Sequence, residues 1–292
     1  MKTESLSARY AFWISAAVVA HTLWTSAAPA MIYPLYAAQW HLSFTLVTVI
    51  FAVYPLTVVV TMLLFAGLSD RAGRKYVMLA GLLSSAAGVL MFAAADSVAV
   101  LLAGRVMMGI GVGLSAGPSA AALVDYAGQG GSARAGAVTL GAQSVGFAAA
   151  LLLAGALVTW GPAPTRLSFY VLFALLIVLI VLCLFIPGDR PVGMPSRLLA
   201  RPDVPVYLRH TFIYAALAVT GAYTHGVLIS SVGAQIARSL IGSPSPWINS
   251  VALALFPVAL GIAGSLARKI EARRSVITGS IVSATGMLSL CI

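Results

Sequence analysis

The chain alternates long apolar stretches with short polar turns. A membrane-spanning helix needs about 20 mostly apolar residues. By this rule the sequence predicts eight spans and a ninth at its end, at 11–37, 44–66, 76–95, 98–124, 136–160, 168–186, 208–236, 246–267 and 275–292. No stretch sustains the strand alternation of an outer-membrane barrel. The pattern therefore predicts an all-α polytopic membrane protein with about 8–9 transmembrane helices.

Composition supports a protein that lies in a lipid bilayer. The 292 residues are 61% hydrophobic and only 8% charged, whereas soluble domains carry about a quarter charged residues. The net charge of +10 would suggest nucleic acid in a soluble protein, but here the basic residues lie mainly in loops, so we expect no nucleic-acid partner. Cys183 and Cys291 both fall in apolar segments and indicate no disulfide framework.

The basic residues also predict an orientation. With the N-terminus in the cytoplasm, 14 of the 17 Lys and Arg residues fall on the inner side. They are Lys2, Arg9, Arg71, Arg74, Lys75, Arg134, Arg190, Arg197, Arg201, Arg209, Arg268, Lys269, Arg273 and Arg274. This bias is the positive-inside rule, and it predicts a cytoplasmic N-terminus.

One segment separates the chain into two parts. Five prolines lie between Pro187 and Tyr207, a density that excludes a regular helix. We expect an N-terminal six-helix bundle at 1–187, a cytoplasmic Pro/Arg-rich linker at 188–207 and a partial C-terminal bundle at 208–292.

The most informative motif is the charged turn AGLSDRAGRK at 66–75, which follows the second predicted span. It resembles the loop between the second and third helices of major facilitator superfamily transporters. The matching residues are Leu68, Asp70, Arg71, Gly73, Arg74 and Lys75. The resemblance implies a secondary active transporter of a small molecule, coupled to protons or another ion, without a cofactor. Within that family, the chain most resembles the bacterial drug/sugar-efflux branch.

A weaker copy of this turn, GSLARKIEAR at 264–273, follows the eighth span at an offset of 198 residues. Parallel half-repeats are typical of facilitator transporters. The family's usual twelve helices would need three more spans, so the chain is expected to be C-terminally truncated, to have its missing helices supplied otherwise, or to be a genuine small form.

The resemblance implies an inner gate built from the charges of this turn. Asp70 is expected at the end of the second helix, where the helix dipole disfavours an anion, so it needs a cation such as Arg74 or Arg134. Asp125, at the end of the fourth span, is a second acid of the same kind. The alternative is that these charges only anchor the loops on the inner side.

Arg105 lies about seven residues into the fourth span, near 10 Å deep. An arginine inside a membrane is costly and indicates function. The stretch GRVMMGIGVG around it resembles the family's fourth-helix motif, whose arginine is associated with proton coupling. The first span carries no acid to pair with it, and snorkelling to the outer surface is the alternative.

Further polar residues fall near the middle of spans and are candidates for a cavity or a proton site. They are His21 and Trp24 in the first span, Gln143 in the fifth, and Tyr223 and His225 in the seventh. A purely structural role, in which each side chain forms hydrogen bonds or packs between helices, is an equally good interpretation. A metal site is not indicated, because no third ligand is near.

Small residues in the fourth span predict close helix packing and a bend. Gly109, Gly113 and Gly117 recur every fourth residue, and Pro118 follows. Near the outer end of the first span, Pro29, Tyr33, Pro34 and Tyr36 indicate an aromatic belt or an outer gate, as does Tyr54 in the second span, and we favour the belt for most of them.

No nucleotide-binding, nucleophile or metalloprotease motif is present, so we do not expect an enzyme. The hypothesis is a transporter that works by alternating access in the bacterial inner membrane. Proton-coupled efflux is the first choice. Import by proton symport, or a non-transporting truncated remnant, is the alternative.

Overall fold

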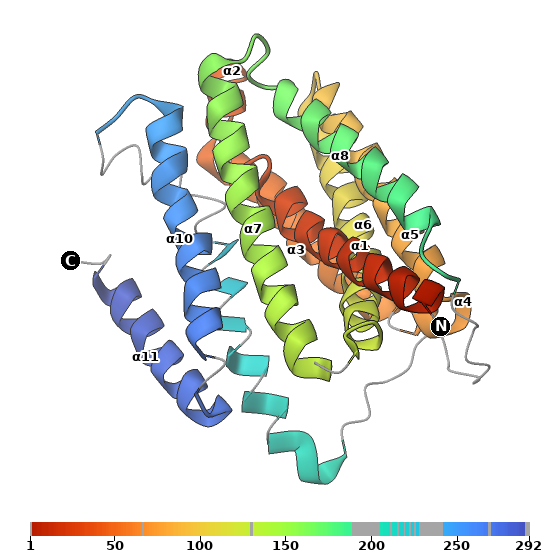
Figure 1. Cartoon of the computed structure of the whole chain (residues 1–292). Coiled ribbons are helices and arrows are strands. Elements are labelled where there is room, and N and C mark those ends of the chain that lie inside the picture. Colours follow the sequence, from red (N-terminus) through yellow and green to blue (C-terminus); the bar gives the residue numbers. More distant parts are fainter. Residues whose placement is uncertain are drawn as a thin grey trace.

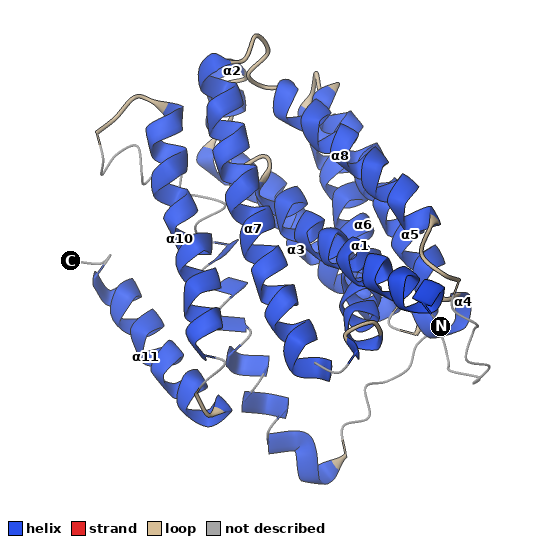
Figure 2. Ribbon diagram, in the orientation of Figure 1, coloured by secondary structure: helices blue, strands red, loops and turns tan. Residues whose placement is uncertain are grey.

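The computed structural model describes residues 2–65, 67–128, 131–188, 205–210, 212–214, 216–218, 220–221, 223–224, 226–227, 242–267 and 270–289. Within these ranges it consists of helices and turns and contains no strand (Figure 2). The all-α fold predicted from the sequence is confirmed for this part of the chain.

The described helices follow the apolar stretches closely. They are α1 (Lys2–Ala27), α2 (Tyr33–Gln39), α3 (Phe44–Leu64), α4 (Leu68–Ala72), α5 (Arg74–Ala93), α6 (Val98–Asp125), α7 (Gly131–Trp160), α8 (Leu167–Leu184), the short 3-10 helix η2 (Val206–Leu208), α10 (Pro246–Ala267) and α11 (Ala272–Ser289). The described residues between 209 and 227 are also helical.

The first predicted span is not one continuous helix. It was expected at 11–37, but α1 begins at Lys2 and ends at Ala27, and α2 starts at Tyr33. Pro29 lies in the turn between them, and Pro34 occupies the first turn of α2. Proline has no N–H and clashes with the preceding turn, but it fits the start of a helix. The two prolines therefore explain both the break and the restart.

The second span also ends earlier than expected. α3 stops at Leu64, and Asp70 lies in the first turn of the separate helix α4. The expectation that Asp70 ends the second helix is therefore wrong, and the carboxylate occupies the favourable end of a helix dipole. Gly73 then joins α4 to α5 with φ of +88°, a backbone conformation that side chains with a Cβ rarely adopt.

Consecutive long helices run in opposite directions, as in α5 and α6, whereas α3 and α6 run parallel to one another (Figure 1). α5 packs along α6, which also contacts α3 and α1, while α8 covers α5. α1 crosses the bundle diagonally and also packs against α7. On its other side, α7 packs along α10. The largest buried apolar cluster joins side chains of α1, α2, α3, α5, α6 and α8. This cluster surrounds the candidate site.

Six of the described helices are long and apolar enough to cross a membrane, namely α3, α5, α6, α7, α8 and α10. Many large apolar side chains on their outer surfaces are exposed, among them Leu56 on α3 and Val178 on α8. In a bilayer these side chains meet lipid rather than water.

Candidate functional site

Arg105 is the most deeply buried charged group in the described part of the chain. Its side chain is 0% exposed, so it does not snorkel to the surface. Its Nε–H donates a hydrogen bond of 2.6 Å to the Tyr33 hydroxyl. Four aromatic rings surround the guanidinium, with ring centroids 5.0–5.7 Å from Cζ, from Tyr33, Phe51, Tyr54 and Phe92. We call these four residues the aromatic cage.

The aromatic cage stabilises the charge only in part. Cation–π contacts contribute about 2 kcal/mol or more when they are desolvated, while burying a charge costs several kcal/mol per ion. Both terminal nitrogens, Nη1 and Nη2, are buried without a hydrogen-bond partner among the described residues. The guanidinium of Arg105 is therefore held in place by the aromatic cage, but its hydrogen-bonding capacity is only partly satisfied.

His21 is a second buried polar group, on α1. Its side chain is 0% exposed, and its Nδ1–H donates a hydrogen bond to the Val18 carbonyl one turn earlier. The other ring nitrogen, Nε2, is buried without a partner in the described part. Trp24 lies one turn further along α1, is half-buried, and packs against the apolar clusters on both sides of the helix. His21 thus has one free nitrogen inside the bundle.

The other described cavity candidates are less buried than Arg105 and His21. Gln143 on α7 is half-buried and forms no hydrogen bond with the described residues, and Tyr223 is 58% exposed. His225 lies outside the described residues. In the described part no group of three or more His, Cys, Asp or Glu side chains is placed to hold a metal ion.

The charged residues at the end of the bundle where α5 begins and α6 ends form a second site. Arg74, the first residue of α5, forms an ion pair with Asp125, the last residue of α6. The next residue, Lys75, donates a hydrogen bond of 2.6 Å to the Leu184 carbonyl at the end of α8. Two adjacent side chains of the motif therefore tie α5 to both of its neighbours at one end of the bundle.

Arg134 ties another corner of the same end. Its Nη1 donates a hydrogen bond of 3.0 Å to the Ala127 carbonyl, and its Cζ lies 4.5 Å from the ring centroid of Phe12 on α1. Asp70 is exposed and forms no ion pair within the described ranges. The expectation that Arg74 or Arg134 pairs with Asp70 is therefore wrong, because α5 and α6 run antiparallel and place Asp125 beside Arg74.

The glycines of α6 differ in their surroundings. A Cβ on Gly109 would lie 2.7 Å from Thr57 Cβ on α3, and one on Gly113 would lie 2.6 Å from Thr61 Cβ. A Cβ on Gly117 would meet nothing within 4 Å. Pro118 is buried within the helix. The small residues thus permit close approach of α3 at two of the three positions.

The contact between α7 and α10 is built from small and aromatic residues. Trp160 stacks against Trp247 with ring centroids 5.3 Å apart at one end of the contact. Further along, Ser144 faces Gly261, and an open apolar groove of about 420 Å³ lies between the two helices there. The Ser144 hydroxyl is buried without a partner in the described part.

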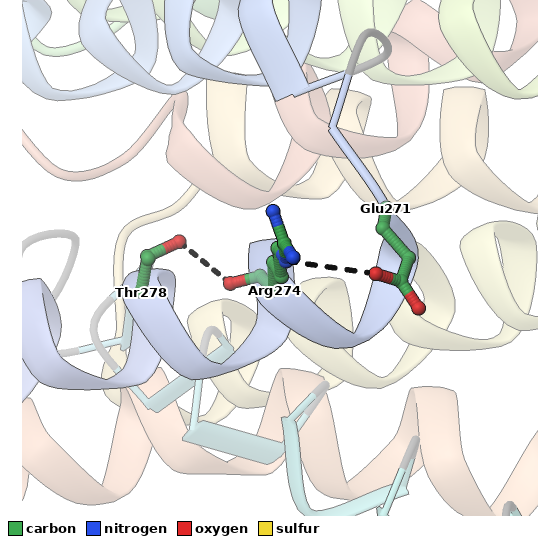
Figure 3. A network of polar contacts seen from close by, with 3 residues as sticks. All are labelled: Glu271, Arg274 and Thr278. Carbon is green, nitrogen blue, oxygen red and sulfur yellow. Dashed lines mark hydrogen bonds and ion pairs between the residues drawn. The ribbon is translucent and has the colours of Figure 1, made fainter.

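The weaker copy of the motif leads into α11. Glu271 forms an ion pair of 3.6 Å with Arg274, whose carbonyl accepts a hydrogen bond of 2.8 Å from Thr278 (Figure 3). Both charged side chains are largely exposed. This ion pair lies within one turn of helix, so it does not tie α11 to another helix.

The sequence pattern does not predict the aromatic cage, and it misplaces three tyrosines, two of which belong to the cage. The sequence favours a membrane-surface belt for most of Tyr33, Tyr36 and Tyr54, but all three are at most 5% exposed. Phe51 lies three residues before Tyr54 on α3, a spacing that places both rings on one helix face. No sequence signal brings Phe92 of α5 to the same place, because that depends on how α5 packs against α6.

Comparison with known proteins agrees with this architecture. A sequence profile of the Major Facilitator Superfamily matches residues 5–292. The structure is similar to the nucleoside transporter NupG, at 14% identity and a TM-score of 0.62, over 90% of this chain and 65% of that one. It is also similar to the peptide transporter POT in complex with sulfate, at 18% identity and a TM-score of 0.51, over 77% of this chain and 46% of that one.

At these identities the two structures support the fold alone. The chain spans less than two thirds of the length of either transporter. No curated protein matches the chain. Because the superfamily profile covers nearly the whole chain, and because six helices can cross a membrane, the chain is an integral membrane protein that belongs to the Major Facilitator Superfamily.

Proposed function

We propose that the chain is a secondary active transporter that moves a small molecule across the membrane by alternating access. Members of its superfamily are transporters and not enzymes. The observation that carries the proposal is two buried ionisable side chains inside the helical bundle, Arg105 on α6 and His21 on α1. Such groups are costly within a bilayer and mark substrate or ion pathways.

In this proposal the contacts of Arg74, Lys75 and Arg134 form the inner gate. They join α5, α6, α7 and α8 near one end of each helix, and they reach Phe12 of α1. An exposed ion pair contributes only about 0–1 kcal/mol, so it can open and reform between two conformations of similar free energy. Asp70 and Arg71 belong to the same turn and complete the proposed gate.

Orientation and direction are part of the proposal. The excess of Lys and Arg at this end supports a cytoplasmic location for the gate and for the N-terminus. We propose an N-terminal bundle at 1–187 and a second bundle that starts near residue 208. Proton-coupled export through a bacterial inner membrane is the favoured mode, with His21 as a candidate proton carrier. Import by symport would use the same groups.

The test is flux in proteoliposomes. Purified protein is reconstituted, and uptake and efflux of a substrate panel are measured with and without a pH gradient. We expect gradient-dependent flux in the wild type and a loss of at least about tenfold in Asp70→Asn and Asp125→Asn.

Asp96→Asn is the matched control. Asp96 is also an exposed aspartate, but it lies in the turn between α5 and α6, at the opposite end from the gate. Its substitution should leave flux unchanged. Absence of flux from folded wild-type protein would contradict transport by this chain. Equal losses in all three variants would contradict the gate.

A further inference from the structure

The guanidinium of Arg105 lacks an anion. Its Nε is satisfied by the Tyr33 hydroxyl, but Nη1 and Nη2 are buried and have no hydrogen-bond partner among the described residues. A buried cation that keeps its charge requires a counter-charge or polar partners. Arginine does not escape this requirement by losing its proton.

No acid in the described part of the chain forms an ion pair with Arg105. The seven acids of the chain are Glu4, Asp70, Asp96, Asp125, Asp189, Asp203 and Glu271. The nearest along the sequence is Asp96, which is exposed and precedes α6. Asp96 precedes Arg105 by nine positions, about 13 Å at the rise of a helix. A bound anion would supply the missing counter-charge.

The geometry around Arg105 favours one kind of anion. The two free nitrogens are the edge that binds two carboxylate oxygens at once. The surrounding groups are aromatic rings, which contribute apolar surface and, from Tyr33, a hydroxyl. Such surroundings suit an anion with a single charge and an apolar body, because a doubly charged, strongly hydrated ion loses more on entering them.

We infer that Nη1 and Nη2 of Arg105, within the aromatic cage, bind the carboxylate of a small organic acid that the protein carries. This inference rests on the proposed transport function, because the cage is closed in this conformation and the ligand enters only when the helices move apart. It assigns the cargo to the class of monocarboxylates with an apolar or aromatic body.

The first test is ligand binding to the full chain in a neutral detergent. Benzoate is the probe, and its neutral isostere benzamide is the control at the same ionic strength. Thermal unfolding is followed by tryptophan fluorescence. We expect benzoate, but not benzamide, to raise the unfolding midpoint in a concentration-dependent way. An equal response to both, or to neither, would overturn the inference.

Variants then locate the site. Arg105→Lys keeps the charge but loses the two-nitrogen edge, so the apparent affinity for benzoate should fall by about tenfold or more. Arg105→Met should abolish the response to benzoate. Without ligand, its unfolding midpoint should match or exceed that of the wild type, because replacing a buried charge by an apolar side chain of similar volume is neutral or stabilising.

Arg166→Met is the matched control, because Arg166 is an exposed arginine just before α8. It should keep the wild-type response to benzoate. If Arg105→Met unfolds at a lower temperature and still responds to benzoate, then Arg105 is a structural residue and the inference is wrong.

Transport experiments separate this inference from the proposed function. Benzoate binding that depends on Arg105, without flux of any panel substrate, would contradict transport but keep the anion site. Flux of neutral or cationic substrates, unaffected by benzoate, would support transport and contradict the assignment of cargo.

Discussion

Two glycines on α6 that look equivalent in the sequence should respond in opposite ways to alanine. The methyl group of Gly109→Ala would lie 2.7 Å from Thr57 Cβ and 2.9 Å from the Tyr54 carbonyl oxygen, both on α3. Atoms cannot remain at these distances, and one of them belongs to the backbone, so α3 and α6 must move apart. The methyl group of Gly117→Ala enters open space.

The magnitudes follow from two opposing terms. Alanine in place of glycine favours a helix by about 1 kcal/mol at both sites. Overpacking a tight contact costs about 1–3 kcal/mol, and only Gly109 incurs it. We therefore expect Gly109→Ala to be neutral or destabilising by up to about 2 kcal/mol, and Gly117→Ala to be neutral or stabilising by up to about 1 kcal/mol.

Reversible unfolding in mixed detergent micelles, followed by circular dichroism, measures both variants against the wild type. Gly109→Leu extends the series and should be clearly less stable than Gly109→Ala, because its branched side chain requires a larger separation of the helices. The reasoning is refuted if Gly109→Ala is more stable than Gly117→Ala, or if Gly109→Leu retains wild-type stability.

Three further predictions concern the two sites. Arg74→Asp should reduce flux, and the double variant Arg74→Asp/Asp125→Arg should restore it. The free energy of unfolding should change by less than about 1 kcal/mol, because the ion pair is partly exposed. If the double variant does not recover flux, the ion pair does not have the proposed role. Tyr33→Phe should lower the free energy of unfolding by about 1–3 kcal/mol, since it leaves Nε of Arg105 unpaired. Tyr36→Phe should cost less, because its hydrogen bonds are 3.4 and 3.5 Å long; equal losses on chemical unfolding would show that the Arg105 bond is not the cause. Gly73→Ala should destabilise the protein by about 1–3 kcal/mol through backbone strain, and an unchanged unfolding midpoint would contradict the need for a positive φ there.

The positions of the helices could be predicted from the sequence because apolar length is a local property. α5, α6, α7, α8 and α10 begin and end within five residues of the predicted spans. The break after Ala27 was missed although Pro29 and Pro34 are visible in the sequence, because apolar length alone carries no information about where the backbone turns.

The candidate site could be predicted less completely. The depth of Arg105 follows from its place in the fourth span, but its surroundings depend on three other elements that supply the aromatic cage. Likewise, the residue facing Arg74 lies 51 positions away along the chain. Contacts of this kind depend on how the helices pack against one another. They cannot be predicted from the pattern of apolar and polar residues along a single helix.

α6 connects the two sites physically. Arg105 and Asp125 are 20 residues apart on this one helix, about 30 Å along its axis. The close contacts with α3 at Gly109 and Gly113 lie between them, and so does Pro118. Proline removes one backbone hydrogen bond and permits a bend. The segment from Pro118 to Asp125 can therefore change its angle when the Arg74 ion pair opens, while the close contacts with α3 hold the segment around Arg105.

On this account, movement at the ion pair reaches the aromatic cage through the helix segment at Pro118, and stiffening that segment should strengthen the coupling. Pro118→Ala restores the missing hydrogen-bond donor. In that variant, Asp125→Asn should alter the apparent affinity for benzoate more than it does in the wild-type background. Equal effects in the two backgrounds would mean that the two ends of α6 act independently, and that the gate and the anion site are linked through another helix.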